Sequence, residues 1–329
     1  MSKHNAGIVI LLARTKILEK TLENFYENFN FKYDYPIYLH TFGKLTDDNY
    51  LINLRKKFSK NIFLEEIDYE IPSHVNEEEL FYNRTYNRYV RKNFSKKRIG
   101  YLHMLRFSAN ITSFGKIGCM SGKMSKFDKI MKFDDESWFK KKINFDLFDI
   151  LEEYPMATGY ADGDGVAEQT RAETSENLWE FYKFYLKKYS YDPIDQELRE
   201  AVVKNNSNII NTLKFKCGNM ELYNIEVIKK SRWQEYIDEV NLYAGDYKYR
   251  WGDNEVIGLF ALTHFVKPFY DFKFKEKGIY YPSLPSEYTK GFAPSPNDYF
   301  NIHSKNFIIF YVFKFILKIR KMVKNLFPS

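Results

Sequence analysis

Three consecutive acidic residues, Asp134, Asp135 and Glu136, follow a short segment at 129–133 that has the apolar content of a buried strand. On an extended chain, alternate side chains point the same way, so Asp134 and Glu136 would share one side. Carboxylate oxygens are ligands that Mg²⁺ and Mn²⁺ prefer. The pattern therefore offers a divalent-metal site at a strand end, although a lone run of this kind is more often an acidic turn that caps the segment 137–142.

Two further acids and one arginine stand at comparable positions. Glu221 closes the segment 218–221, which is a second candidate strand end. Asp253 precedes an apolar helix that we expect to begin near Glu255, so it can cap that helix, support chemistry, or do both. Arg14 follows the first apolar segment, where a ligand of an α/β sheet would lie, and a solvated surface arginine is the alternative.

The elements that would position these residues alternate between strand and helix. Residues 8–12 form a continuous apolar run of strand length, and large apolar side chains recur at helical spacing over 18–29. Residues 37–40 and 61–64 follow as further strands. This alternation predicts an α/β domain with a parallel sheet covered by helices. No repeat and no Pro/Gly/Ser-rich linker divides the chain, so a single domain is the simpler partition.

Length and composition limit the class of protein. The chain has 329 residues, 44% of them hydrophobic and 28% charged, which indicates a soluble globular protein with a sizeable core. Its two cysteines, Cys119 and Cys217, provide neither a disulfide framework nor a Cys-x-x-Cys zinc site. The net charge of +7 is spread along the sequence, so nucleic acid is not an expected partner. No signal peptide or N-terminal anchor is seen, and we expect a cytoplasmic protein.

The C-terminal tail differs from the rest of the chain. Residues 307–317 are strongly apolar, and several basic residues follow them within a few positions. The apolar run is too short to cross a bilayer as a helix, which takes about 20 residues. We expect one domain over 1–304 and a hydrophobic and basic helix over 305–329. This helix would either lie at a membrane surface through residues 306–328 or pack on the domain's own core.

Four separated motifs connect the candidate residues to a known family. They are Gly-Tyr-Leu-His-Met-Leu-Arg-Phe at 100–107, Lys-Phe-Asp-Asp-Glu at 132–136, Asn-Met-Glu-Leu at 219–222 and Arg-Trp-Gly-Asp at 250–253. In order and in spacing they resemble motifs of the fungal α-1,2-mannosyltransferases of glycosyltransferase family 15. The resemblance runs over about residues 5–282.

This resemblance implies a GT-A type nucleotide-diphospho-sugar transferase fold, a single Rossmann-like α/β domain with a mixed, mainly parallel sheet. It also implies an enzyme that moves mannose from GDP-mannose to a hydroxyl of a mannose-containing glycan, with retention of the anomeric configuration. Mn²⁺ or Mg²⁺ would assist, because a divalent ion stabilises the charge of a leaving diphosphate as a Lewis acid.

The resemblance assigns several residues to the donor. Tyr101 matches a family tyrosine close to the diphosphate. Arg14 and Arg106 would add fixed positive charge toward phosphate, which arginine can bind with two parallel hydrogen bonds. Asp134 would hold the metal and contribute to donor binding, and Glu136 would join it directly or through water.

Two residues are assigned to the transfer itself. Glu221 matches the family's second carboxylate on the β face of the donor sugar, where it acts as a nucleophile or stabilises an oxocarbenium-like transition state, by analogy with retaining glycosidases. Asp253 would hold the acceptor hydroxyl or support the site, and this role is compatible with helix capping.

The chain departs from the family pattern at the metal. The family has Glu at the position of Asp134 and Pro at that of Asp135, and it places a histidine shortly before a proline where this chain has Gly-Ile-Tyr-Tyr-Pro at 278–282. Either metal coordination would then rely on carboxylates and on the diphosphate, or the enzyme would depend less on metal than the family does. The family's N-terminal membrane anchor and additional cysteines are also missing, which favours a reducing compartment.

Two other functions fit part of the sequence. A metal-dependent phosphodiesterase or nuclease could use Asp134, Glu136, Asp253 and the basic excess, and would bind nucleic acid with a steep salt dependence. A catalytically inactive scaffold could bind sugar nucleotides without the family histidine. The sequence predicts no particular oligomeric state.

Overall fold

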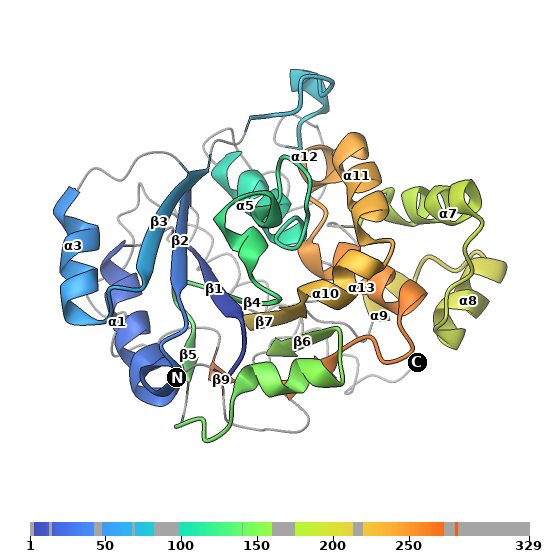
Figure 1. Ribbon diagram of the computed structural model, residues 1–329. Coiled ribbons are helices and arrows are strands. Elements are labelled where there is room, and N and C mark those ends of the chain that lie inside the picture. Colours follow the sequence, from blue (N-terminus) through green and yellow to red (C-terminus); the bar gives the residue numbers. More distant parts are fainter. Residues whose placement is uncertain are drawn as a thin grey trace, which may run out of the picture. The chain divides into compact units, whose positions relative to one another are not determined.

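A seven-stranded sheet forms the centre of the residues that the structure describes (Figure 1). The computed structural model describes residues 3–12, 15–42, 48–67, 70–81, 99–139, 141–159, 175–212, 220–272 and 280–281. The strand order across the sheet is β3-β2-β1-β4-β7-β6-β8, and β5 pairs with β9 in a separate two-stranded sheet. The strands are β1 (Ala6–Leu11), β2 (Ile37–Phe42), β3 (Ile62–Ile67), β4 (Lys129–Phe133), β5 (Trp138–Phe139), β6 (Met156–Gly159), β7 (Met220–Asn224), β8 (Tyr270–Asp271) and β9 (Tyr280–Tyr281).

The sheet is mixed and mainly parallel, as predicted. Strands β3, β2, β1 and β4 run parallel to one another, and β8 runs parallel to β6. Strand β7 is the exception, because it runs antiparallel to both of its neighbours, β4 and β6. The amino end of β7 therefore lies beside the carboxyl end of β4. Glu221 is the second residue of β7 rather than the end of a strand, which corrects the expectation for residues 218–221.

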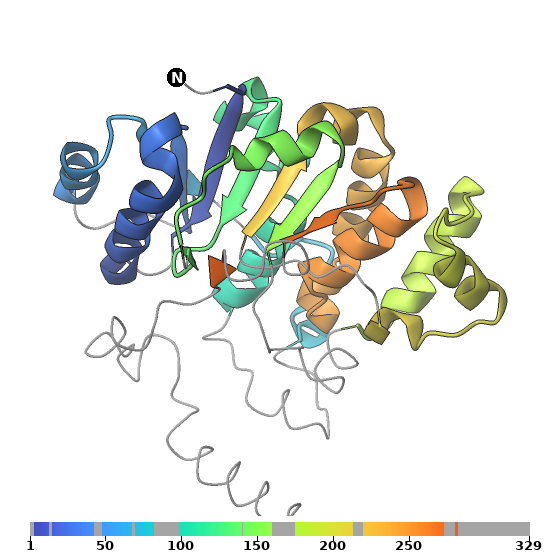
Figure 2. The same ribbon diagram turned by 90° about the horizontal axis from the view of Figure 1, so that it is seen from below.

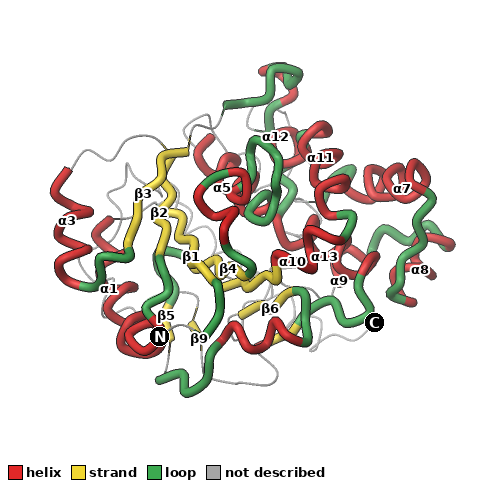
Figure 3. The backbone as a smooth tube through the Cα atoms, viewed as in Figure 1, coloured by secondary structure: helices red, strands yellow, loops and turns green. Residues whose placement is uncertain are grey.

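Helices cover both faces of the sheet (Figures 2 and 3). Figure 2 shows α1 and α3 on one side and α11 and α13 on the other. The helix predicted over 18–29 is an α-helix only as far as Phe25. The chain then continues as a π-helix over Tyr26–Asn30. The α-helices are α1 (Thr15–Phe25), α2 (Phe31–Tyr33), α3 (Asp48–Lys57), α5 (Ile99–Ala109), α7 (Leu178–Tyr189), α8 (Gln196–Val203), α9 (Ile209–Thr212), α10 (Ile225–Lys230), α11 (Trp233–Tyr243), α12 (Gly245–Tyr249) and α13 (Asp253–His264). The 3-10 helices are η2 (Glu77–Glu79), η4 (Cys119–Ser121), η5 (Lys123–Lys126) and η6 (Leu147–Glu152).

The alternation of side chains along the strands creates two cores. Ile8 and Phe133 pack into the core that includes α1, whereas Val9, Ile130 and Tyr223 pack into the core that includes α5, α7, α11 and α13. Because central strands are covered on both faces, they are apolar almost throughout. A charged residue inside such a strand must find a partner, since burying an unpaired charge is costly.

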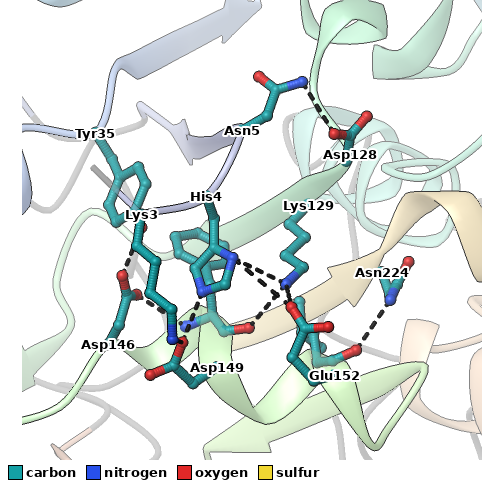
Figure 4. Close-up of polar contacts among 12 residues, drawn as sticks. Lys3, His4, Asn5, Tyr35, Asp128, Lys129, Asp146, Asp149, Glu152 and Asn224 are labelled. Carbon is teal, nitrogen blue, oxygen red and sulfur yellow. Dashed lines mark hydrogen bonds and ion pairs between the residues drawn. The ribbon is translucent and has the colours of Figure 1, made fainter. Parts of the chain in front are cut away.

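The amino-terminal edge of the sheet is fastened by a charged cluster (Figure 4). Asp149 accepts hydrogen bonds from Lys3 Nζ at 2.6 Å and from His4 Nε2 at 2.7 Å. Lys129, at the start of β4, donates to Glu152 and to His4 Nδ1. His4 Nδ1 therefore acts as the acceptor and Nε2 carries the proton. This cluster ties the beginning of the chain to η6, at the opposite end of β4 from the acidic run.

The part of the chain described above contains no helix that is both long enough and apolar enough to span a membrane. The tail over 305–329 and the predicted boundary after residue 304 lie outside the described residues. The two alternatives for the tail therefore stay predictions.

Candidate active site

The antiparallel pairing of β4 with β7 places a lysine beside a glutamate. Lys132 and Glu221 are register partners, so both side chains project from the same face of the sheet. Lys132 Nζ donates to Glu221 Oε1 at 2.9 Å. The pair is buried, because the Lys132 side chain is only 6% exposed and that of Glu221 is inaccessible.

Two more acids reach the same ammonium group. Lys132 Nζ lies 3.4 Å from Asp253 Oδ2, at the start of α13, and 4.0 Å from Asp134 Oδ1, just after β4. Exposure rises from 0% for the side chain of Glu221 to 15% for Asp253 and 33% for Asp134. The structure therefore gathers three predicted site acids around one lysine, and the side of the cluster nearest solvent is that of Asp134.

Glu221 has both carboxylate oxygens occupied by donors. Oε1 accepts from Lys132, and Oε2 accepts from the hydroxyl of Tyr223, two residues along the same strand. Burial raises the pKa of Glu221 above its ordinary value, and the negative charge of Asp253 adds to the effect, while Lys132 and Tyr223 oppose it. The two donors both orient this carboxylate and favour its charged form.

Asp134 lies in a turn that ends β4. The Ser137 N–H donates to the Asp134 carbonyl at 3.0 Å, so the chain from 134 to 137 is folded back. The pKa of Asp134 is raised to about 7, mainly by burial; the charge of Lys132 opposes this shift, and the negative charges of Glu221, Asp135 and Asp253 add to it. An additional cation beside Asp134 would therefore stabilise the charged form of this carboxylate.

The turn after β4 bears on the prediction that Asp134 and Glu136 bind a metal ion together. Asp134 and Glu136 were expected to point the same way along an extended chain, but the turn removes that premise. In the ranges that the structure describes, no group of three or more His, Cys, Asp and Glu side chains is arranged to hold a metal ion. Mg²⁺ and Mn²⁺ are commonly bound by one or two carboxylates together with substrate phosphates. Asp134 fits that mode, because it is partly exposed and surrounded by negative charge, and the role of Glu136 stays a prediction.

Asp253 is the first residue of α13, so the helix begins two residues earlier than expected. The N-cap position belongs to Gly252, and Asp253 Oδ1 accepts from the Asn254 N–H at 3.0 Å. The other oxygen, Oδ2, faces Lys132. Asp253 thus satisfies one of the free N–H groups of the first turn while presenting its second oxygen to the acidic cluster.

Trp251 holds the segment that leads into α13 in place. Its ring is buried and stacks on Tyr243 at a centroid distance of 5.0 Å, and its Nε1 donates to the carbonyl of Glu176 at 2.7 Å. Gly245 faces this ring so closely that a Cβ atom there would lie 2.1 Å from it. A side chain at position 245 would therefore displace Trp251 and, with it, the start of α13.

We expect Gly245→Ala to lower the free energy of unfolding by about 3 kcal/mol, since overpacking a close contact forces the ring from its position. Gly100→Ala is the matched control, because nothing lies within 4 Å of a Cβ atom there and α5 gains helix propensity. Urea unfolding of both variants measures the difference. Equal stability of the two variants would show that Trp251 does not depend on Gly245.

Tyr101 contacts Arg250, the first residue of the Arg-Trp-Gly-Asp motif. Arg250 Nη2 donates to the Tyr101 hydroxyl at 3.2 Å, and the guanidinium carbon lies 5.0 Å from the centre of the Tyr101 ring. Arg250 adopts a left-handed backbone conformation with φ of 62°, which separates α12 from α13. Arg250 belongs to the Arg-Trp-Gly-Asp motif at 250–253, and its contact with Tyr101 was not predicted from the sequence.

Residues 1–282 match the family described as glycolipid 2-alpha-mannosyltransferase. The chain belongs to this family. Its fold is similar to that of the mannosyltransferase Ktr4p from S. cerevisiae in complex with GDP, with a TM-score of 0.64 at 19% identity over 87% of this chain and 74% of that one. It is also similar to core-mannan synthase A (CmsA/Ktr4) from Aspergillus fumigatus in its Mn/GDP form, with a TM-score of 0.60 at 16% identity over 82% and 73% of the two chains. No curated protein matches the chain.

Family membership confirms the resemblance derived from the four motifs and makes this protein a glycosyltransferase. The structural similarity confirms the GT-A type fold. Within this family member, the structure brings Asp134, Glu221 and Asp253 together, and it places Tyr101 beside Arg250.

The two predicted phosphate-binding arginines have different outcomes. Arg106 is buried, and its guanidinium donates to both oxygens of Asp246 at 3.2 and 3.3 Å and to the carbonyl of Asn241 at 3.2 Å. In this arrangement it fastens α5 to α12, and its role toward phosphate stays a prediction. Arg14 lies outside the described residues.

Lys132 is the site residue that the sequence argument missed. A signal was present, because Lys132 interrupts the apolar strand Lys129–Phe133 two residues before Asp134. Its partner could not be predicted, since the register of β7 against β4 is set by contacts between segments far apart in the sequence.

A separate hollow of about 590 Å³ lies on the same face as α5, beside β2 and β3. Its lining includes His40, Glu65, Lys116, Lys123 and residues 117–119 and 121–122, and none of the clustered acids contributes to it. The His40 Nε2 is buried and lies 3.6 Å from Glu65 Oε2. This hollow is therefore distinct from the acidic cluster.

Proposed function

We propose that this glycosyltransferase transfers mannose from GDP-mannose to a hydroxyl of a mannose-containing glycan, with retention of the anomeric configuration and with the help of Mn²⁺ or Mg²⁺. The observation that carries the proposal is the convergence of Asp134, Glu221 and Asp253 on Lys132 at the carboxyl end of β4. In open α/β sheets, ligands bind at this end of the strands.

The donor side is assigned to the more exposed part of the cluster. Asp134 would hold the divalent ion, which when bound supplies Lewis-acid stabilisation of the leaving diphosphate. Tyr101 can donate a hydrogen bond to a phosphate oxygen, and the neighbouring Arg250 adds positive charge close to it. The structures of Ktr4p with GDP and of CmsA in its Mn/GDP form support this choice of donor and ion.

The transfer step is assigned to the buried part of the cluster. Glu221 would act on the anomeric carbon, as a nucleophile or as a charge that stabilises an oxocarbenium-like transition state. Its side chain has no accessible surface, so contact with a donor sugar requires an opening movement over it. Asp253 would accept a hydrogen bond from the acceptor hydroxyl.

A panel of nucleotide sugars tests the proposal. The protein is incubated with Mn²⁺ and each sugar nucleotide, with and without mannose-terminated acceptors, and nucleoside diphosphate release is measured. We expect GDP release from GDP-mannose that increases with acceptor. Binding without release would instead indicate an inactive scaffold. Consumption of no sugar nucleotide, together with salt-dependent binding of DNA or RNA, would favour the phosphodiesterase or nuclease alternative.

For the tail we propose peripheral membrane contact of a cytoplasmic protein through residues 306–328, on the basis of the apolar run and the basic residues after it. Flotation with anionic liposomes compares the full chain with a chain that ends at residue 304. We expect only the full chain to float with the vesicles. Equal flotation of the two chains would remove the proposal.

A further inference from the structure

Lys132 is a buried lysine whose ammonium group lies within 4.0 Å of three acids of the proposed transfer site. Burying an ammonium group is costly unless it is paired and hydrogen-bonded. Here three acids from three separate segments, at the end of β4, in β7 and at the start of α13, surround one nitrogen atom. Such a convergence is far more than is needed to neutralise a single lysine.

Lys129 shows what a purely structural lysine looks like on the same strand. Its side chain is 9% exposed, nearly the same as that of Lys132, but its carboxylate partner Glu152 is 64% exposed and lies at the opposite end of β4 (Figure 4). It also contacts His4 and the carbonyl of Phe148. Lys129 therefore fastens the amino-terminal edge of the sheet and touches none of the site acids that surround Lys132.

The carboxylate of Glu221 is oriented from two sides. Lys132 binds one oxygen and Tyr223 binds the other, so rotation of the carboxylate would break at least one hydrogen bond. Without Lys132, only Tyr223 would hold Glu221, and Asp253 would lose the cation that it shares with Glu221. Like charges that lose a shared cation repel each other, and each carboxylate would turn away.

We propose that Lys132 is a positioning residue for mannose transfer, which fixes the direction of the Glu221 carboxylate and aligns it with Asp253. The expected effect on catalysis rests on the proposed function. The effect of Lys132 on the orientation of Glu221 and Asp253 can be tested whether or not that function holds. A fixed carboxylate acts on the reacting carbon without first paying for its own reorientation.

The kinetic test compares Lys132→Met, Lys132→Arg and the matched control Lys129→Met. We expect Lys132→Met to lower kcat about 100-fold, as misplacement of a reacting group does, and to change KM for GDP-mannose and the affinity for GDP less than about threefold. Lys132→Arg keeps the charge and should recover kcat to within about tenfold of wild type. Lys129→Met should lose stability but keep kcat. Equal kcat values for the two methionine variants would overturn the inference.

A crystal structure of Lys132→Met decides the matter independently of activity. We expect the Glu221 carboxylate to turn away from Asp253 in this variant and to stay in place in Lys129→Met. An unchanged Glu221 carboxylate would overturn the inference. This test remains valid if the wild-type protein consumes no GDP-mannose and the proposed function fails. If Lys132→Met does not fold, Lys132→Gln, which is polar but shorter than lysine and uncharged, takes its place in both experiments.

Discussion

Glu221→Gln is expected to lower kcat by about three orders of magnitude or more, while the affinity for GDP changes less than about threefold. Glutamine keeps the shape of the side chain and an oxygen for Lys132, but it carries no negative charge. It can therefore neither attack the anomeric carbon nor stabilise positive charge that develops there. Steady-state GDP release and calorimetric GDP titration measure the two quantities.

The control for this substitution is Glu226→Gln, in the first turn of α10. Glu226 is exposed and its nearest cation, Lys230, is 4.0 Å away, so its removal should leave kcat unchanged. A loss of GDP affinity in Glu221→Gln that equals the loss of kcat would assign Glu221 to ground-state binding. Unchanged kcat would remove it from the mechanism.

Asp134→Asn is expected to weaken Mn²⁺ and GDP together, by about 100-fold or more, because the metal loses a charged ligand and the diphosphate loses the metal. Calorimetric titration of GDP with and without Mn²⁺ measures the effect. In the absence of metal, the variant should bind GDP as wild type does. A Mn²⁺-dependent GDP affinity equal to that of wild type would place the ion elsewhere.

The raised pKa of Asp134 gives this prediction a pH dependence. Because the pKa is about 7, a proton competes with the metal, and the apparent Mn²⁺ affinity of wild type should fall as pH drops below 7. The folded protein binds this proton more tightly than the unfolded chain, so charging Asp134 costs folding free energy as pH rises from about 4 to 7. Asp134→Asn should therefore be at least as stable as wild type at pH 8 without metal, which separates lost binding from misfolding.

Local patterns predicted the elements better than their pairing. The apolar segment at 129–133 has the predicted bounds as β4, and the strands expected at 37–40 and 61–64 are present as β2 and β3 with longer carboxyl ends. The fold class followed from the order of strands and helices.

The site depends on contacts that no local pattern encodes. An extended chain was predicted over residues 134–136. The structure has a turn there instead, because the Ser137 N–H donates a hydrogen bond to the Asp134 carbonyl. The buried pair of Arg106 with Asp246 joins residues far apart in the sequence. Pairing at such separations reflects tertiary packing, which no local pattern of residues reveals.

A crystal structure of the protein with GDP and Mn²⁺ tests the central claim most directly, namely that the acids around Lys132 form the transfer centre. We predict the metal ion bound to Asp134 and the diphosphate between Asp134 and Tyr101, with Glu221 on the side where the sugar would continue. GDP bound elsewhere, for example in the hollow beside His40, with no ion at Asp134, would contradict the account.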